Sequence, residues 1–263
     1  MSHRAAPAKL NLALVVGPKQ PDGKHAVTTV LQRITLADTV TLEPGDGLDV
    51  EGYEDDTIVR QALEQLAARA GITPSWRVRI EKRIPVAAGL GGGSTDAAAA
   101  LHLANETLPN RLATEALHEL AASIGADVPF FLTEGPQLGE GDGTTLGPLD
   151  LPQDYWIDVI VPHGERKAST ASVYEAFTGH DGFPERRAAV LSALAIGDLA
   201  ALPPNDLASS PLAEELRDLG AFRADVSGAG PAVYGLFADE SQALTALAAL
   251  DGRGETWIAA PAW

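Results

Sequence analysis

Four glycines crowd directly in front of an alanine-rich segment in "IPVAAGLGGGSTDAAAAL", residues 84–101. The residues before them, "RVRIEKRIPV", alternate apolar and charged side chains as a strand does. The residues after them read as a helix start, with Ser94 as the N-cap and Asp96 in the first turn, where the helix dipole favours negative charge. A strand, a glycine loop and a helix N-terminus together bring bare N–H groups and a positive dipole end to one point. The stretch therefore predicts an anion site, with phosphate as the expected ligand.

The loop fits neither of the common nucleotide fingerprints. It contains no GxxxxGK[ST], so it has no built-in lysine, and no GxGxxG with a downstream acid for a ribose. Any cation that neutralises phosphate must therefore come from elsewhere in the chain.

Two polar positions could supply the remaining chemistry, each with an ordinary alternative. In "PAKLNLALVV", Lys9 and Asn11 lie on the strand face opposite Leu10, Leu12 and Leu14, where polar residues are usually just a solvent face. In "SIGADVPFFL", Asp127 is either a turn aspartate or a carboxylate held rigidly beside apolar surface, as a general base requires.

Two loops carry weaker signals. The turn "PDGKHAVTT" places His25 either as a ligand-reading side chain or as an exposed loop histidine. In "SGAGPAVYGLF", Gly228 and Gly230 form either a hairpin bulge or a second loop that approaches phosphate closely.

Composition excludes several classes of function. The formal net charge of −17 argues against nucleic acid as a partner, although locally concentrated cations could still bind a small phosphorylated ligand. Four of the five lysines (Lys9, Lys19, Lys24 and Lys82, but not Lys167) fall in the first third of the chain, which hints at such an anion pocket. The absence of cysteine fits a cytoplasmic protein. The N-terminus lacks a cleavage site for a signal peptide, and no segment approaches the ~20 apolar residues of a membrane helix.

Strand and helix patterns are interleaved without a regular βαβ repeat, which indicates an α+β fold. The predicted strands are Lys9–Val16, Thr28–Ala37, Thr39–Glu43, Trp76–Glu81 and Trp156–Val161. The predicted helices are Thr57–Ala70, the one after the glycine loop, Ala113–Ser123, Ala171–Phe177, Arg186–Ala195 and Glu240–Ala249, with a strand–glycine–strand unit in "RADVSGAGPAVYGLFAD". The proline-bearing "LGPLDLPQDY" predicts a crossing between an N-terminal domain, 1–153, and a C-terminal domain, 154–263.

Taken in order, "PAKLNLAL", "PVAAGLGGGSTDAAAAL" and "SGAGPAVYGLF" resemble the three motifs of the GHMP kinase superfamily. "DGKH", "GADVPFF", "STASVYEAF" and "NDL" are similar to the branch of that superfamily whose acceptor is a cytidine diphosphate sugar alcohol. The resemblance spans nearly the whole chain. It implies an α+β two-domain kinase with an α/β ATP-binding half, a ferredoxin-like C-terminal half and the active site between them.

The resemblance also implies a role for each matching residue. Asp127 would take the proton of the acceptor hydroxyl and contact the substrate, and Lys9 would keep Asp127 ionised and stabilise the attacking oxygen. The ATP site would be formed by Lys82 and Asp56 near adenine and by Pro85, Gly89, Leu90, Gly91, Gly92, Gly93, Ser94 and Thr95. The acceptor would contact Asn11, Lys24, His25 and Gly228. Mg²⁺ is expected with ATP, and no protein metal ligands are predicted.

Two positions depart from that branch. Lys24 stands where a tyrosine usually stacks on cytosine, and a lysine offers a cation instead of an aromatic face. Asp56 stands where an asparagine is common near adenine, and a carboxylate only accepts hydrogen bonds.

The expected function is ATP-dependent phosphorylation of the 2-hydroxyl of 4-diphosphocytidyl-2-C-methyl-D-erythritol, for isoprenoid precursors made without mevalonate. Two alternatives stay open: a kinase of the same superfamily for another small alcohol, which Lys24 motivates, and a non-catalytic nucleotide sensor, which needs neither Lys9 nor Asp127. The expected partners are small molecules only, with no nucleic acid or membrane, and the expected assembly is a monomer or weak homodimer.

Overall fold

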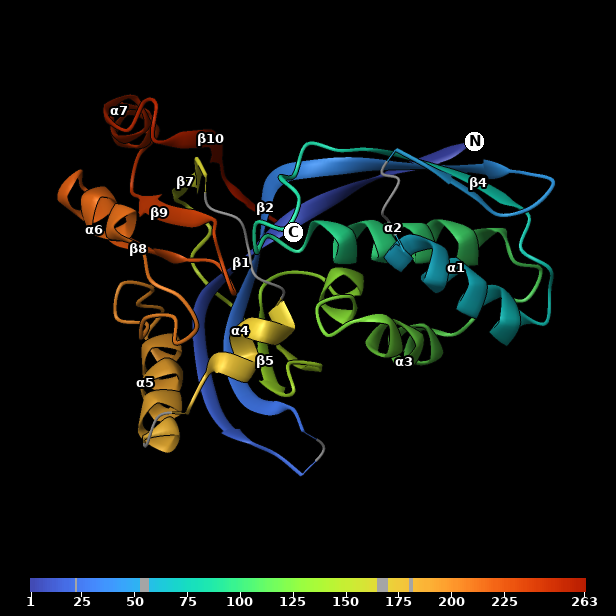
Figure 1. Ribbon diagram of the computed structural model, residues 1–263, viewed down its shortest axis with the longest axis horizontal. Coiled ribbons are helices and arrows are strands. Elements are labelled where there is room, and N and C mark those ends of the chain that lie inside the picture. Colours follow the sequence, from blue (N-terminus) through green and yellow to red (C-terminus); the bar gives the residue numbers. More distant parts are fainter. Residues whose placement is uncertain (22, 53–56, 165–169, 180–181) are drawn as a thin grey trace. The chain divides into compact units, whose positions relative to one another are not determined.

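A computed structural model describes residues 1–21, 23–52, 57–164, 170–179 and 182–263 (Figure 1). The described chain folds into two compact units. Unit 1 contains residues 1–8, 37–86 and 91–134, and unit 2 contains residues 9–36, 87–90 and 135–263. Strands β1 (Ser2–Lys19) and β2 (His25–Pro44) therefore contribute residues to both units.

Unit 1 combines a small sheet with a helical layer. The second half of β2 pairs antiparallel with β4 (Trp76–Glu81), from Thr39 opposite Glu81 to Pro44 opposite Trp76. Strand β3 (Asp49–Glu51) runs parallel to β4. In β4, Trp76, Val78 and Ile80 are buried while the charged residues between them are not, because successive side chains of a strand point to opposite faces.

The helices of unit 1 bury their apolar faces against one another and this sheet. They are α1 (Thr57–Ala70), α2 (Gly92–Thr107), α3 (Thr114–Ile124) and the short 3₁₀ helix η1 (Pro129–Leu132). Helix α1 packs against both α2 and α3 (Figure 1). Alanines 97–100 of α2 are buried, and their small side chains let the neighbouring elements approach closely.

In unit 2, the first half of β2 pairs with β5 (Gln137–Gly141), which pairs in turn with β6 (Thr145–Pro148). Strand β11 (Pro261–Ala262) adds to β2 at Ile34 and Arg33, and β1 also pairs with β2.

The other sheet of unit 2 has the strand order β10-β7-β9-β8, with every neighbouring pair antiparallel. The strands are β7 (Trp156–Pro162), β8 (Arg223–Val226), β9 (Val233–Phe237) and β10 (Gly254–Ala259). The helices are α4 (Thr170–Ala176) and α5 (Phe183–Ala195), with α6 (Pro211–Asp218) and α7 (Glu240–Ala249) packed on the sheet. This β-α-β-β-α-β order confirms the predicted ferredoxin-like arrangement.

The structure confirms the α+β class and corrects some elements. The helices at Thr57–Ala70 and Glu240–Ala249 have the predicted bounds, but β2 is one strand where two were predicted, divided at Asp38. Asp38 does not break the strand because its buried carboxylate accepts hydrogen bonds from the backbone N–H groups of Arg83 and Ile84. Strands β3, β5, β6, β10 and β11 and helix α6 were not predicted. The domain boundary at 153/154 stays a prediction.

None of the helices in the described part of the chain is long and apolar enough to cross a bilayer.

Candidate active site

The motifs "PAKLNLAL" and "SGAGPAVYGLF" come together in unit 2. Lys9 is buried, at 4% exposure, and its Nζ donates to Asn11 Oδ1 at 2.5 Å. The Lys9 backbone N–H donates to the Leu90 carbonyl at 2.9 Å, which joins β1 to the start of the glycine loop. The solvent-face interpretation of Lys9 and Asn11 is therefore wrong, because both side chains lie inside the unit.

Neighbouring hydroxyls fix the orientation of the Asn11 amide. Asn11 Nδ2 donates to Thr29 Oγ1 at 2.8 Å, and the Thr29 hydroxyl donates to the Ala13 carbonyl at 2.8 Å. Ser227 Oγ accepts from the Asn11 backbone N–H at 3.3 Å and donates to the Gly89 carbonyl at 3.0 Å. Since the amide nitrogen is held by Thr29, the carbonyl oxygen of Asn11 faces the Lys9 ammonium.

Two glycines allow the backbone to approach this cluster. Gly228 has φ +58°, and a Cβ there would lie 3.2 Å from Asn11 Oδ1 and 3.4 Å from Lys9 Nζ. Gly89 has φ +87°, and a Cβ there would lie only 2.3 Å from the Ser227 carbonyl oxygen. The contact with the 227–230 loop is thus enough to require glycine at position 89.

In unit 1, the glycine loop ends as helix α2 begins. The helix starts at Gly92, and its N-cap is Gly91 in the left-handed conformation, with φ 73°. The predicted N-cap at Ser94 is wrong, because Gly92 and Gly93 themselves adopt helical geometry. No side chain caps the first turn. The backbone N–H groups of residues 92–94 can therefore donate hydrogen bonds to an anion.

Asp96 does not serve the helix dipole as predicted. It is fully buried, and its Oδ2 accepts from Lys82 Nζ at 2.6 Å, while Asp38 Oδ2 accepts from the same ammonium at 2.5 Å. Burial lowers the pKa of Lys82, but the Asp96 and Asp38 carboxylates outweigh it and raise that pKa above its ordinary value. A Cβ on Gly92 would lie 3.3 Å from Lys82 Nζ, so this ion cluster borders the first turn of α2.

Asp127 lies in the turn between α3 and η1. The Val128 backbone N–H closes the turn on the Gly125 carbonyl at 3.1 Å, and Val128, Pro129 and Phe130 are buried immediately after it. The half-buried Asp127 therefore directly precedes a buried apolar segment, the setting that its sequence context predicted.

His25 begins β2 and lines a cavity of about 320 Å³ in unit 2. Its Nδ1 donates to the Gly17 carbonyl at 2.8 Å, which leaves Nε2 as the acceptor in the neutral ring. The ring lies 5.7 Å from Phe177, edge-on, and 6.1 Å from Tyr174. The interpretation of His25 as an exposed loop histidine is therefore wrong.

Lys24, next to His25, forms an ion pair on the surface. Its Nζ lies 2.5 Å from Asp142 Oδ2, and the Lys24 side chain is 62% exposed. Hydrogen bonds from Lys24 and Thr144 lower the pKa of Asp142 to about 2. Lys24 and Lys82 are thus both paired with carboxylates, and the anion pocket that the positions of the lysines suggested stays a prediction.

The predicted site residues thus form two groups. Unit 2 contains Lys9, Asn11, Lys24, His25, Gly89, Leu90 and Gly228, and unit 1 contains Lys82, Pro85, Gly91, Gly92, Gly93, Ser94, Thr95 and Asp127. Asp56 lies outside the described residues. Sequence reasoning missed Thr29, Ser227 and Asn205, and the only sequence signal for Asn205 was the "NDL" motif.

Among the described residues, no group of three or more His, Asp or Glu side chains could hold a metal ion. The first-turn amides of α2 fit a phosphate group, but nothing in the described chain resembles an all-protein cation cage.

Comparisons with known proteins agree on the family. Two family models match the chain: the GHMP kinases N-terminal domain at residues 57–135 and the GHMP kinases C-terminal domain at residues 199–256. A Geobacter metallireducens protein named 4-diphosphocytidyl-2-C-methyl-D-erythritol kinase is 36% identical over 97% of this chain and 96% of its own. A protein of the same name from Pelotomaculum thermopropionicum is 39% identical over 89% of this chain and 88% of its own. A crystal structure of 4-(cytidine 5'-diphospho)-2C-methyl-D-erythritol kinase superposes with a TM-score of 0.83 at 33% identity and covers 100% of both chains.

Proposed function

Because this chain belongs to the GHMP kinase family, we propose that it transfers the γ-phosphoryl group of ATP to the 2-hydroxyl of 4-diphosphocytidyl-2-C-methyl-D-erythritol. The observation that carries the proposal is the similarity to kinases of that name along nearly the full length of both chains. In this role the protein would catalyse a step in the synthesis of isoprenoid precursors by the route that does not use mevalonate.

The proposed reaction is an in-line displacement. The acceptor oxygen bonds to the γ-phosphorus as the bond to the β,γ-bridging oxygen breaks, ADP leaves, and the hydroxyl proton passes to a base. Phosphoryl transfer depends mainly on positioning and on charge stabilisation, so the protein needs amide donors, a cation and a carboxylate.

We assign these parts to the described residues. The uncapped first turn of α2 and the loop before it, from Gly89 to Thr95, would hold the ATP phosphates, with Pro85 and Lys82 flanking the nucleotide. Asp127 would accept the proton, supported by its half-buried position beside a rigid apolar turn. Lys9, oriented by Asn11, would stabilise the attacking oxygen. Mg²⁺ would arrive bound to the ATP phosphates and neutralise their charge.

The setting of His25 supports a cytidine acceptor over another small alcohol. With Nδ1 donating to Gly17, the neutral ring can accept a hydrogen bond from an exocyclic amine such as that of cytosine. The adjacent Phe177 and Tyr174 supply the aromatic surface that Lys24 lacks. Lys24 is already paired with Asp142, which weakens its case as the counter-ion of an acidic acceptor.

A coupled assay of ADP release tests this proposal. Turnover with the cytidine diphosphate sugar alcohol, and none with homoserine or mevalonate, is expected. In the same assay Asp127→Asn should lower kcat by at least about 100-fold, the low end for loss of a general base, with ATP affinity unchanged. Asp150→Asn changes an exposed aspartate in the same way and should leave kcat unchanged. ATP binding without turnover of any alcohol would instead identify a nucleotide sensor.

A further inference from the structure

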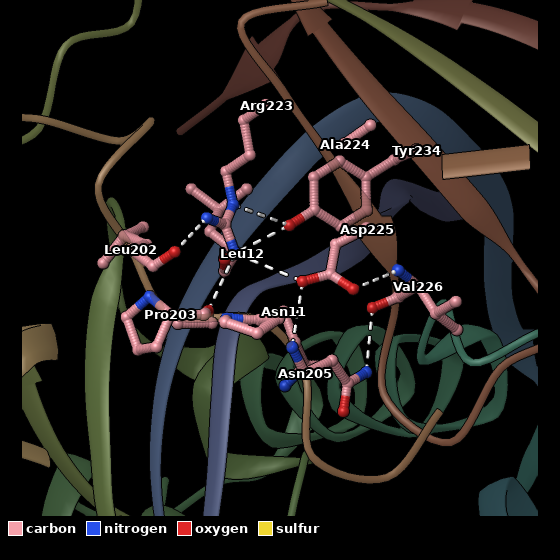
Figure 2. Close-up of polar contacts among 12 residues, drawn as sticks. Asn11, Leu12, Leu202, Pro203, Asn205, Arg223, Ala224, Asp225, Val226 and Tyr234 are labelled. Atoms are coloured by element: carbon pink, nitrogen blue, oxygen red, sulfur yellow. Dashed lines mark hydrogen bonds and ion pairs between the residues drawn. The ribbon is translucent and has the colours of Figure 1, made fainter. Parts of the chain in front are cut away.

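Asn205 is a buried asparagine that makes several hydrogen bonds beside the unit 2 cluster (Figure 2). It is 9% exposed, and its Nδ2 donates to the carbonyls of Val226 at 2.9 Å and Gly228 at 2.6 Å. Its Oδ1 accepts from the Leu207 N–H at 2.8 Å. Both hydrogens of the amide are used, so the side chain fixes two carbonyls of the 226–228 backbone at once.

Asp225 joins Asn205 to the neighbouring strand. Its Oδ2 accepts from the Asn205 backbone N–H at 2.9 Å and from Arg223 Nη2 at 3.3 Å, and its Oδ1 accepts from the Val226 N–H at 2.8 Å. One carboxylate thus binds both the segment that carries Asn205 and the start of the 226–228 backbone (Figure 2).

Arg223 extends the network to β1. It is 5% exposed and donates to the carbonyls of Leu202 at 2.5 Å and Pro203 at 3.0 Å, which fixes the approach to Asn205. Its Nε donates to the Tyr234 hydroxyl at 3.2 Å, and that hydroxyl donates to the Leu12 carbonyl at 3.2 Å. The network is therefore anchored on β1 one residue beyond Asn11.

The other end of the network reaches the proposed reaction centre. The Gly228 backbone is so close to the ends of Asn11 and Lys9 that a Cβ would lie 3.2 Å from Asn11 Oδ1 and 3.4 Å from Lys9 Nζ. Because Asn205 holds the Gly228 carbonyl, a shift of Asn205 moves the backbone that covers the Lys9 ammonium.

We infer that Asn205 is a positioning residue: it holds the Gly228 backbone against Lys9 and Asn11, and so fixes the cation that the reaction uses. Its role is indirect, since it acts through Gly228. The kinetic part of the inference rests on the proposed function, whereas the structural part can be measured without any substrate.

Differential acetylation of lysines provides that measurement. Limiting acetylation followed by mass spectrometry reports the reactivity of each of the five lysines in the folded protein. In Asn205→Ala, the buried Lys9 should be acetylated at least about tenfold faster than in the wild type, because local opening exposes it. Lys82 in unit 1 should react at its wild-type rate.

Asn105→Ala is the matched control. Asn105 also bridges a loop in two directions, donating to the Leu112 carbonyl at 3.1 Å and accepting from the Leu112 N–H at 2.8 Å, but it lies in unit 1. It should leave the Lys9 rate unchanged. An unchanged Lys9 rate in folded Asn205→Ala overturns the inference. If that variant does not fold, Asn205→Ser, whose hydroxyl keeps one donor, should show the same effect at smaller size.

Kinetics then separate positioning from a general loss of structure. Asn205→Ala should lower kcat with the cytidine substrate by about 10- to 100-fold per folded molecule, with the KM for ATP unchanged. An equal decrease of kcat in Asn105→Ala would overturn the positioning role. If the wild type itself does not turn over that substrate, the proposed function fails, and the Lys9 acetylation rates still decide this inference.

Discussion

Asp38 in unit 1 and Asp158 in unit 2 are both fully buried, yet their surroundings are opposite. Asp38 accepts hydrogen bonds from Lys82 Nζ, the Arg83 N–H and the Ile84 N–H. Asp158, in the middle of β7, has no hydrogen-bond partner for either carboxylate oxygen among the described residues. Gly235 and Ile258 lie opposite it on the neighbouring strands.

The difference shows how each unit meets the cost of burying a carboxyl group. The Lys82 ammonium and two backbone N–H groups compensate the buried carboxyl group of Asp38. No described residue donates a hydrogen bond to the Asp158 carboxyl group, and burial raises its pKa to about 7. Unit 1 therefore contains a buried carboxyl group that is hydrogen-bonded to a cation, whereas unit 2 contains a buried acid that is neutral in the lower part of the physiological pH range.

Removing the cation of the Asp38 cluster should give the largest effect. Lys82→Met leaves the buried carboxylates of Asp38 and Asp96 without their ammonium partner, which typically costs about 3–5 kcal/mol of unfolding free energy. Urea denaturation at pH 7 measures the loss.

Two further variants check the cause. Lys19→Met removes an exposed lysine and should change the unfolding free energy by less than about 0.5 kcal/mol. Adding Asp96→Asn to Lys82→Met should recover part of the loss. A Lys82→Met protein as stable as the wild type would show that the two buried carboxylates do not need the ammonium group for stability.

Asp158→Asn should change the unfolding free energy by a smaller amount, and it should stabilise the protein. Between its ordinary pKa of 3.8 and about 7, the folded protein holds a proton that the unfolded chain releases. Stability from this group is thus present at low pH, falls by up to about 1.4 kcal/mol per pH unit as pH rises through that window, and is level above it. Because asparagine does not titrate, the unfolding free energy of the variant does not fall in this way. The variant should be at least about 1 kcal/mol more stable than the wild type at pH 8.

Denaturation curves at several pH values between 4 and 8 make the comparison. A constant difference between variant and wild type across this range would mean that Asp158 does not titrate there.

The exposed Lys24–Asp142 pair should give the smallest change in stability. Lys24→Tyr should cost no more than about 1 kcal/mol, because surface ion pairs contribute little. If cytidine is the recognition element, the new ring should lower the KM of the cytidine substrate about two- to tenfold through stacking, with kcat unchanged. A raised KM would sink the cytidine assignment and leave the family membership intact.

The sequence was informative where local chemistry decides the structure. The strand, glycine loop and helix at residues 76–107 follow from alternation and from glycine itself, although the helix begins two residues before the predicted cap. The burial of Lys9 was not predictable. Its side-chain partner Asn11 is held by Thr29 and Ser227, which reach Asn11 only through tertiary pairing. Asp38 misled the prediction for the same reason: its donors lie more than 40 residues away.

The division of β1 and β2 between the two units has a consequence for biosynthesis. Unit 1 is complete in the chain once Glu134 has been made, whereas residues 9–36 belong to unit 2, whose other strands are translated later. A ribosome-bound chain that has just reached Glu134 therefore carries the first half of β2 without β5 and β11, which pair with it in the finished protein. Strand β1 is already present and pairs with β2, so only the stretch of β2 that later binds β5 and β11 lacks its partners. Because an unpaired strand edge attracts other chains, aggregation through this edge is favoured until those strands have been made.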